Sequence, residues 1–262
     1  MKVVLFCGGK GVRLQEDGGI NLPKPMVRIG PRPVLWHVMK YYAHFGHTDF
    51  ILCLGHKAEV IKDYFLHYDE TVSNDFTLID GREVELRRRD LEGWRITFVD
   101  TGLESNLGER LSAVRPHLEG EEMFLANYSD GLTDLHLPKM IDQFRASDAV
   151  GAFLCTRPQQ SFHIVDFDES GRVRRIGPIA EADVWINGGY FVFRQSIFDV
   201  LGEGEELVAE PFGRLIDRGA LMACRHDGFW FPMDTFKDRL ALEQMLEQGT
   251  DRWALWKESD RR

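Results

Sequence analysis

The stretch that decides the fold reads Val3-Val4-Leu5-Phe6-Cys7-Gly8-Gly9-Lys10-Gly11-Val12-Arg13-Leu14, with Pro23-Lys24-Pro25 after a short polar segment. Its first five residues are apolar and mostly β-formers, which predicts a strand. Three glycines directly after a strand let the backbone approach a ligand closely and turn its N–H groups toward an anion. Arg13 and Lys24 add a planar guanidinium and a compact ammonium, a pair suited to phosphate. The stretch therefore predicts a phosphate-binding loop, with a solvated surface turn as the alternative.

Two common phosphate loops are excluded by the residues present. A P-loop requires Gly-x4-Gly-Lys-Ser/Thr, and the sequence contains no such run. The dinucleotide-binding fingerprint requires a third glycine where Leu14 stands. What remains is a strand that leads into a glycine-rich cationic loop of another kind.

The rest of the chain alternates between strand-like and helix-like segments. Helices are expected over residues 34–45, 58–68, 107–114, 137–146, 212–218 and 235–248, with a further one near Ile197. Strands are expected over residues 50–54, 94–99, 123–128, 149–156, 185–193 and, as the last strand, 222–225, and β-hairpins over residues 76–89 and 163–176. Such alternation predicts an α/β fold: a mostly parallel, Rossmann-like mixed sheet with helices on both faces and small hairpin additions. We expect one domain over residues 1–262.

Charge and cysteine content narrow the possible partners. A formal net charge of -10 argues against nonspecific binding to nucleic acid or to an anionic membrane, so the cations for a phosphate ligand must be local. The four cysteines lie far apart, mostly in apolar runs, which is typical of buried free thiols rather than a disulfide frame or a zinc site. No signal peptide or membrane-length apolar run is evident, and we expect a cytoplasmic protein.

The motif Gly8-Gly9-x-Gly11-x-Arg13-Leu14, followed by Pro23-Lys24-Pro25, resembles the signature of the sugar-1-phosphate nucleotidyltransferases. Further motifs in the same order make the chain similar, over nearly its whole length, to the glucose-1-phosphate cytidylyltransferases. These motifs are Pro33-Val34-Leu35-Trp36-His37, Asp100-Thr101-Gly102, Tyr128-Ser129-Asp130-Gly131, Ile186-Asn187-Gly188-Gly189 and Phe229-Trp230-Phe231-Pro232-Met233-Asp234-Thr235.

The resemblance implies a reaction in which a sugar-1-phosphate attacks the α-phosphorus of a nucleoside triphosphate, with CTP favoured, and pyrophosphate leaves. The nucleophile is already an anion, so the difficulty is to bring two anions together and to stabilise charge on the transferred group. A divalent metal and fixed cations suit that chemistry, and the resemblance implies Mg²⁺. It also implies a homo-oligomer.

The resemblance assigns the metal to Asp130 and Asp234. Asp130 follows a predicted strand, at the end where ligands collect in α/β sheets. From spacing alone, an Asp-Gly turn that closes the strand is the favoured interpretation of Asp130, and Asp234 or Thr235 could cap the following helix. A magnesium site with two carboxylates, completed by substrate phosphates and water, is chemically normal.

Other roles also come from the resemblance. Arg13 would neutralise the triphosphate, and Lys24 would contact the phosphates at the reacting centre. The nucleotide would be bound by Phe6, Cys7, Gly8, Gly9, Lys10, Gly11, Val12, Ser105, Arg110 and Ser129, and the sugar phosphate by Tyr128, Asn187 and Gly188. By residue type alone, Arg110 could be a helix-surface arginine and Asn187 a turn residue.

Several positions depart from the family pattern. Val12 stands where a threonine is usual, Glu109 where a glycine is usual, and no lysine occurs in residues 177–183, where the family has one that meets the sugar phosphate. The Glu109 carboxylate would repel an anionic ligand unless it accepts a hydrogen bond from the exocyclic amine of a base, as it can from cytosine. Ser129, His163 and Phe231 are further departures. One hypothesis is an active enzyme with an altered acceptor, in which Arg174 or Arg175 replaces the lost lysine.

The alternative is a non-catalytic nucleotide-binding homologue that acts as a regulatory or partner protein. Retention of both aspartates, Arg13 and Lys24 favours the enzyme. A nucleotide-sugar glycosyltransferase is disfavoured because Asp130 is not part of an Asp-x-Asp motif.

Overall fold

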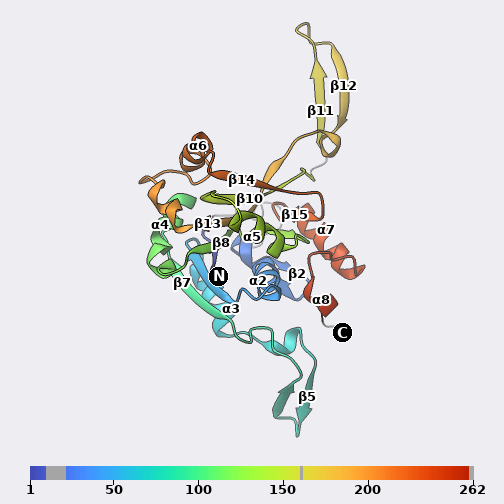
Figure 1. The fold of residues 1–262 in the computed structure, drawn as a ribbon. Helices are drawn as coiled ribbons and strands as arrows, with labels where there is room; N and C mark the ends of the chain where they lie inside the picture. The colour runs from blue at the N-terminus through green and yellow to red at the C-terminus, as the bar shows by residue number, and fades with distance from the viewer. Residues whose placement is uncertain (10–21, 160–161, 260–262) are drawn as a thin grey trace.

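The computed structural model describes residues 1–9, 22–159 and 162–259, and its body is built on a seven-stranded sheet (Figure 1). The strand order is β14-β10-β13-β8-β1-β4-β7. These strands span Val3–Phe6 (β1), Asp49–Leu54 (β4), Arg95–Asp100 (β7), Met123–Asn127 (β8), Gly151–Thr156 (β10), Ile186–Arg194 (β13) and Leu221–His226 (β14).

Strand directions confirm the mixed, mostly parallel sheet expected from the sequence. β1 runs parallel to β4 and to β8, β4 runs parallel to β7, and β10 runs parallel to β14. Only β13 is reversed, since it pairs antiparallel with both β8 and β10. As a result, the carboxyl ends of β1, β8 and β10 and the amino end of β13 meet at one edge of the sheet.

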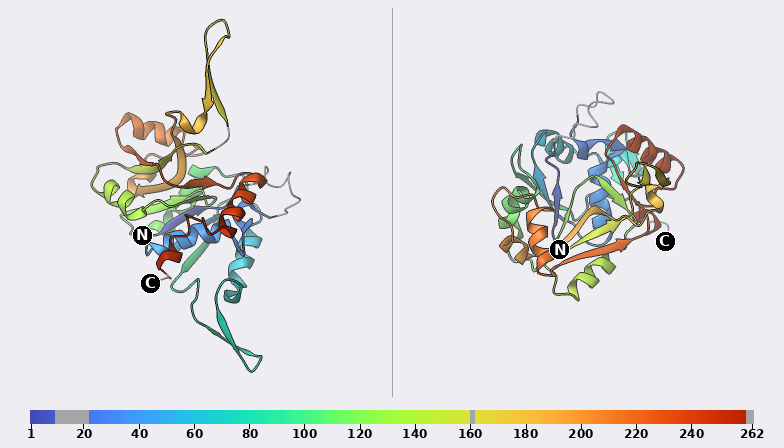
Figure 2. Two further views of the ribbon diagram at one scale, coloured as in Figure 1. Left: turned by 90° about the vertical axis from the view of Figure 1, so that its right-hand side faces the viewer. Right: turned by 90° about the horizontal axis from the view of Figure 1, so that it is seen from above.

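Helices cover both faces of the sheet, as predicted, and β1 is therefore buried on both sides. Val3 and Leu5 belong to one apolar core and Val4 and Phe6 to the other. Figure 2 shows helices on either side of the sheet. The first core receives α2 (Val34–His44), α3 (Ala58–Leu66), α5 (Leu137–Arg145), α7 (Phe236–Glu247) and α8 (Trp256–Ser259); the second receives α4 (Leu107–Val114) and α6 (Glu210–Asp217).

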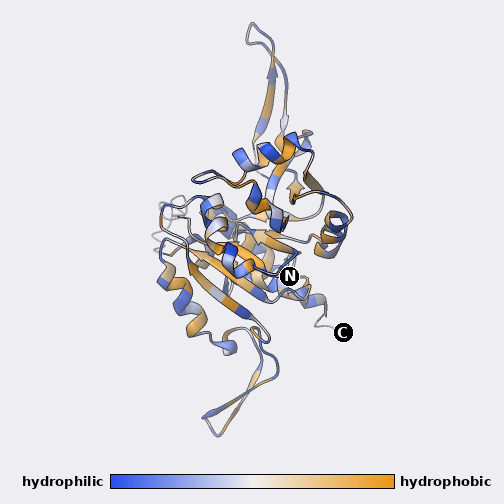
Figure 3. Cartoon of the chain, turned by 60° about the vertical axis from the view of Figure 1, so that its left-hand side comes forward, coloured by the Kyte–Doolittle hydropathy of each residue, from blue (hydrophilic) through white to orange (hydrophobic). Residues whose placement is uncertain are grey.

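Two β-hairpin arms leave the body at opposite ends in Figures 1 and 2. The first arm pairs β5 (Phe76–Ile79) with β6 (Glu83–Leu86), and the second pairs β11 (His163–Phe167) with β12 (Val173–Pro178). Both hairpins were predicted. Figure 3 shows that hydrophobic residues fill the body and also continue along the arm of β11 and β12. In the second arm Phe167, Val173 and Ile176 are all more than 60% exposed.

The expectation that residues 222–225 form the last strand was wrong. A later strand, β15 (Trp230–Pro232), pairs antiparallel with β9 (Gly131–Thr133) in a separate two-stranded ribbon. Each strand has only three residues, which is too short to show an alternating pattern, and Pro232 argues against a strand. The missed ribbon matters because it joins the two segments that carry Asp130 and Asp234.

The remaining expectations concern side chains in the core. All four cysteines are free and buried, as predicted. Trp253 is buried, and the neutral form of His37 links it to the body: His37 donates to the Ile29 carbonyl and accepts from the Trp253 indole at 3.3 Å. Among the described helices, none has the length and apolar character needed to span a bilayer.

Candidate functional site

Gly8 and Gly9 follow β1 at the sheet edge, and Arg110 packs directly against Gly8. The Arg110 guanidinium is buried and donates to the Gly8 carbonyl, the Leu54 carbonyl and the Thr101 hydroxyl at 3.2, 3.2 and 2.7 Å. A Cβ at position 8 would lie 2.0 Å from Arg110 Nη1, so only glycine fits there without displacing the guanidinium. Among the described residues, no carboxylate pairs with this buried cation. Arg110 is therefore not a helix-surface arginine.

The amino end of α4 explains Glu109, one of the departures from the family pattern. Asn106 caps the helix by accepting from the Glu109 amide, and the Glu109 carboxylate accepts from the Asn106 amide, both at 2.9 Å. This reciprocal capping box occupies Glu109 with the helix terminus. The hypothesis that Glu109 accepts a hydrogen bond from a base gains no support. Ser105 lies beside this cap and donates to the Thr101 carbonyl at 2.6 Å.

Lys24 lies between the two predicted metal aspartates. It opens a short 3₁₀ turn, Lys24–Met26, between Pro23 and Pro25, and its ammonium contacts Asp130 Oδ2 at 2.6 Å and Asp234 Oδ1 at 2.5 Å. The Lys24 side chain is 18% exposed, and those of Asp130 and Asp234 are 23% and 38% exposed. Residues that are 106 and 210 positions apart in sequence thus converge on one charge.

The electrostatics of this cluster follow from partial burial of three charges. Burial alone would lower the pKa of Lys24, but the two carboxylates together raise it above its ordinary value. Burial raises the pKa of Asp130, although Lys24 acts in the opposite direction. A site that concentrates two carboxylates at a partly dry strand end attracts cations strongly.

The backbone fixes Asp130 and Asp234 relative to each other. The Met233 amide donates to the Asp130 carbonyl at 2.9 Å, which continues the β9–β15 ribbon up to the two aspartates. Thr235, not Asp234, caps α7, so the Asp234 side chain is left to face Lys24. Ser129 adopts a left-handed backbone conformation (φ 68°) that is costly for a residue with a Cβ, which accounts for the glycine usual at this position. Its hydroxyl donates to the Phe6 carbonyl at 2.8 Å.

On the other side of Asp130, the predicted sugar-phosphate residues lie together. The Asn187 side-chain nitrogen donates to the Tyr128 hydroxyl at 3.0 Å, and the Asn187 side-chain oxygen Oδ1 accepts from the Gly189 backbone amide. The Gly188 carbonyl accepts from the Trp230 indole at 2.9 Å, and a Cβ on Gly188 would lie 2.9 Å from Leu154. Leu154 and Trp230 therefore pack too closely against Gly188 for a residue with a side chain to fit at that position.

The two arginines that were considered as substitutes for the missing lysine are not at this edge. Arg174 and Arg175 belong to β12, in the exposed second arm. A different arginine, Arg157, directly follows β10; it stacks on Trp185 at 4.5 Å and donates to the Ala182 carbonyl. No local sequence pattern indicates Arg157, because its position depends on strand pairing.

A cavity of about 330 Å³ connects most of these groups. Its lining combines the glycine segment, the amino end of α4 and the end of β8, and includes Phe6, Gly8, Gly9, Ser105, Asn106, Leu107, Arg110, Tyr128, Asp130 and Glu206. A smaller adjoining hollow is lined by Cys7, Lys24 and Ser129 as well. Burial raises the pKa of the Cys7 thiol to about 12, so it is an inert wall residue.

The structure thus brings together nearly all of the predicted site residues that it describes. Lys10, Gly11, Val12 and Arg13 lie outside the described residues. Within the described ranges, no group of three or more His, Cys, Asp or Glu side chains is placed to hold a metal, and the carboxylates that contact Lys24 number two. Glu206 was not predicted, since it lies in a loop without any motif.

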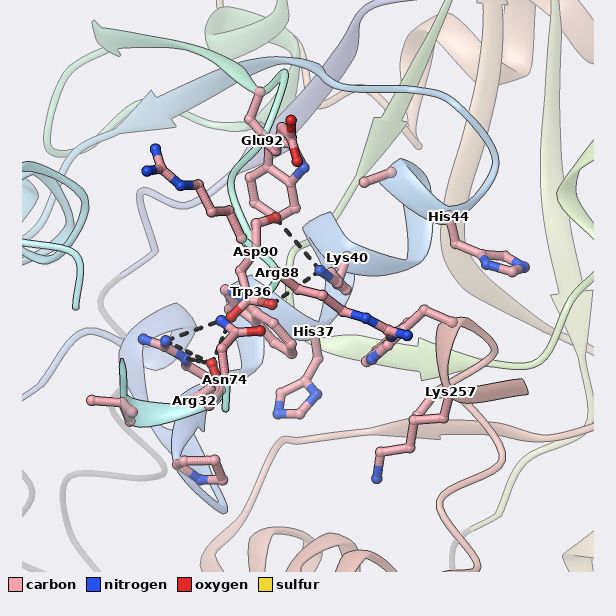
Figure 4. A pocket seen from close by; sticks show the side chains of 18 of the residues that line it. Arg32, Trp36, His37, Lys40, His44, Asn74, Arg88, Asp90, Glu92 and Lys257 are labelled. Carbon is pink, nitrogen blue, oxygen red and sulfur yellow. Dashed lines mark hydrogen bonds and ion pairs between the residues drawn. The ribbon is translucent and has the colours of Figure 1, made fainter. Parts of the chain in front are cut away.

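A larger cavity, about 1100 Å³, lies elsewhere, between α2, the loop after β6 and the C-terminal region (Figure 4). At its floor Asp90 is buried and contacts Lys40 at 3.1 Å, Ser73 at 2.6 Å and Tyr68 at 2.8 Å. These contacts tie the base of the first arm to α2. The cavity contains neither the glycine segment nor the Asp130 cluster, so size alone does not identify the site.

Comparison with known proteins agrees with the fold and with the family that the sequence motifs indicate. The family model described as Nucleotidyl transferase matches residues 2–248. The chain is 39% identical to the glucose-1-phosphate cytidylyltransferase of Salmonella typhi over 98% of this chain and 100% of that protein. It is 36% identical, with the same coverage, to the probable glucose-1-phosphate cytidylyltransferase of Bacillus subtilis (strain 168).

Solved structures share the fold. HddC from Yersinia pseudotuberculosis superposes with a TM-score of 0.69 at 19% identity, covering 94% of this chain and 99% of that one. UDP-glucose pyrophosphorylase complexed with UDP-glucose superposes with a TM-score of 0.68 at 15% identity, covering 95% and 98%.

Proposed function

Because the chain belongs to the nucleotidyl transferase family, we propose that it joins a sugar-1-phosphate to a nucleoside triphosphate, with CTP favoured, and releases pyrophosphate. The reaction would be carried out by a single domain over residues 1–262. The observation that carries the proposal is the convergence of Lys24, Asp130 and Asp234 beside the glycine segment, at the sheet edge where ligands bind in α/β folds.

The cations divide the work of the reaction. Lys24 contacts the phosphates at the reacting centre, where its ammonium offsets charge that develops on the transferred group. Arg13 neutralises the triphosphate and the leaving pyrophosphate. Gly8 and Gly9 let the nucleotide approach the backbone, and Arg110 forms the wall against which the base lies. No general base is required, because the attacking phosphate oxygen is already ionised.

Asp130 and Asp234 fit a divalent metal, and we propose Mg²⁺. Both carboxylates already reach one positive charge, the Lys24 ammonium, at 2.6 and 2.5 Å, so they are close enough to share a cation. Two carboxylates completed by phosphate oxygens and water form a donor set that Mg²⁺ prefers. When bound, the metal would polarise the α-phosphate and help to align the two phosphates.

The acceptor is proposed to be glucose-1-phosphate or a related sugar phosphate. Two relatives with full coverage carry the name glucose-1-phosphate cytidylyltransferase. We propose that Asn187, Gly188 and Tyr128 contact the sugar: Asn187 donates to the Tyr128 hydroxyl, and Tyr128 lines the cavity together with Asp130. Because residues 177–183 contain no lysine, an altered acceptor remains part of the proposal.

A homo-oligomer is also proposed, and the second arm supports it. Its strands expose Phe167, Val173 and Ile176 at 62%, 62% and 65%, together with Phe162 at 67%. Exposed apolar residues that gather on one projecting element are typical of an interaction surface. A second copy of the chain would bury them.

The experiment that tests the function is pyrophosphate release in the presence of Mg²⁺, with each nucleoside triphosphate combined in turn with a panel of sugar-1-phosphates. Turnover with CTP and glucose-1-phosphate would support the proposal as stated, and turnover with another sugar phosphate would identify an altered acceptor. Nucleotide binding without turnover across the panel would favour a non-catalytic protein.

A further inference from the structure

The cavity at the proposed nucleotide site is lined by an acidic side chain, one of whose carboxylate oxygens has no hydrogen-bond partner among the described residues. Glu206 lies in the loop before α6 and lines the same cavity as Gly8, Ser105 and Arg110. Its Oε1 atom is shielded from solvent and has no hydrogen-bond partner among the described residues. A buried acceptor without a donor costs roughly 1–3 kcal/mol, so this oxygen calls for a donor beyond those that the described residues supply.

The neighbouring acids differ from Glu206 in this respect. Glu205 is paired with Arg214 and accepts from the Gly202 amide, and Glu210 accepts from the Glu206 amide at 3.2 Å. Glu109 is held in the capping box of α4. Among these acids, Glu206 is thus the one that lines the cavity and has a carboxylate oxygen without a partner among the described residues.

The loop that carries Glu206 is fixed at the α4 end of the cavity. The Asn106 side-chain amide donates to the Gly204 carbonyl at 2.8 Å. Packing is close, since a Cβ on Gly108 would lie 2.2 Å from the Glu205 carbonyl oxygen. The proposed reaction places the phosphates beside Asp130 and Lys24, which line the adjoining hollow together, and leaves the α4 side of the cavity for the base. The base end of the nucleotide therefore comes next to Glu206.

Among the described residues that line the α4 end of the cavity, the charged donor is Arg110, and its guanidinium already has partners. Arg110 uses its guanidinium on two carbonyls and on Thr101. An unpaired carboxylate oxygen accepts hydrogen bonds but cannot donate one, so it favours a base edge with an amino group and repels a base edge with a carbonyl oxygen. Cytosine presents an exocyclic amine at the position where uracil and thymine present an oxygen, and a carboxylate is a suitable acceptor for that amine.

We propose that Glu206 accepts a hydrogen bond from the exocyclic amino group of the base and thereby selects CTP over UTP. This inference rests on the proposed nucleotidyl transfer and adds to it the residue that reads the base. It assigns to Glu206 the role that the sequence suggested for Glu109.

The test compares the wild type with Glu206→Gln and with the control Glu203→Gln, which changes an exposed acid of the same loop. The kcat/KM for CTP, UTP and dCTP is measured with glucose-1-phosphate and Mg²⁺. Glutamine has the same shape but can turn an N–H toward the uracil oxygen. The loss of a hydrogen bond to a charged group lowers kcat/KM by about 10- to 100-fold. The ratio of kcat/KM for CTP to that for UTP should therefore fall by this factor in Glu206→Gln, while Glu203→Gln keeps the wild-type ratio.

Two results would overturn the inference. One is a CTP/UTP ratio that Glu206→Gln leaves within about twofold of wild type. The other is a change confined to the CTP/dCTP ratio, which would place Glu206 at the ribose. Calorimetric titration of CTP and UTP into the same three proteins separates this question from catalysis. Preferential CTP binding that depends on Glu206, without pyrophosphate release, would support the base contact and refute the proposed reaction.

Discussion

Substitution of Gly8 by alanine isolates the contact between the glycine segment and Arg110. The new Cβ would lie 2.0 Å from Nη1, 2.3 Å from Cζ and 2.7 Å from Nη2 of Arg110. Since the optimal separation of non-bonded carbon atoms is about 3.5–4.0 Å, the guanidinium must move by more than about 1 Å. That displacement breaks the 2.7 Å bond to Thr101 and at least weakens the bonds to the Gly8 and Leu54 carbonyls.

The expected cost follows from the bonds that are lost. Hydrogen bonds that involve a charged group contribute about 1.5–3 kcal/mol each, so the loss of one or two predicts a destabilisation of roughly 2–5 kcal/mol. For a domain near this size, each kcal/mol lowers Tm by about 2–4 °C. Thermal denaturation followed by circular dichroism measures this change. CTP affinity, measured by calorimetry, should fall in parallel because Arg110 lines the same cavity.

The adjacent glycine provides a matched control. No described atom lies within 4 Å of a Cβ built on Gly9, so Gly9→Ala should change stability by less than about 0.5 kcal/mol. Equal Tm values for Gly8→Ala and Gly9→Ala would refute the argument that Arg110 is seated on Gly8. A selective loss at Gly8 would sustain it.

Three further predictions concern charge, pH and assembly. Lys24→Met should lower kcat for pyrophosphate release by about 10²–10³, the effect of removing one fixed stabilising donor, and an unchanged kcat would exclude Lys24 from the reacting centre. Burial lowers the pKa of His37 to about 4, so the unfolded chain binds the proton first, and the free energy of unfolding should fall by up to ~3 kcal/mol as pH drops from about 6.5 to 4. When this free energy is measured by urea unfolding at several pH values, it should depend less steeply on pH in His37→Gln than in the wild type. An identical pH dependence would contradict this cause. Phe167→Glu, on the exposed face of the second arm, should reduce the mass measured by light scattering, whereas Ser170→Glu in the turn of the same arm should not; equal masses would remove the arm from the interface.

The sequence was most informative for site residues that directly follow a strand. The apolar runs predicted that Gly8 and Asp130 each follow a strand, and the parallel pairing of β1 with β8 brings these two strand ends to the same sheet edge. The contact of Lys24 with Asp234 was not available from local patterns. It depends on the β9–β15 ribbon, whose strands have three residues each and contain no alternation.

Side-chain roles within loops were harder to infer. The spacing of Asn106 and Glu109 is that of a capping box, and this local signal accounts for Glu109 without any ligand. Glu206 carries no such signal, because its environment is created by packing of its loop on α4. Arg157 is a similar case, since its contact with Trp185 requires the pairing of β10 with β13.

The central claim is that the α-phosphate of a nucleotide is transferred to a sugar phosphate at Asp130. The most direct measurement uses CTP labelled at the α-phosphorus, glucose-1-phosphate and Mg²⁺, with products separated by chromatography and Asp130→Asn as the comparison. We expect the label to appear in a nucleotide sugar and not in pyrophosphate, and to remain in CTP with the variant. Label that stays in CTP with the wild type, or that appears in free CMP or CDP, would contradict the claim.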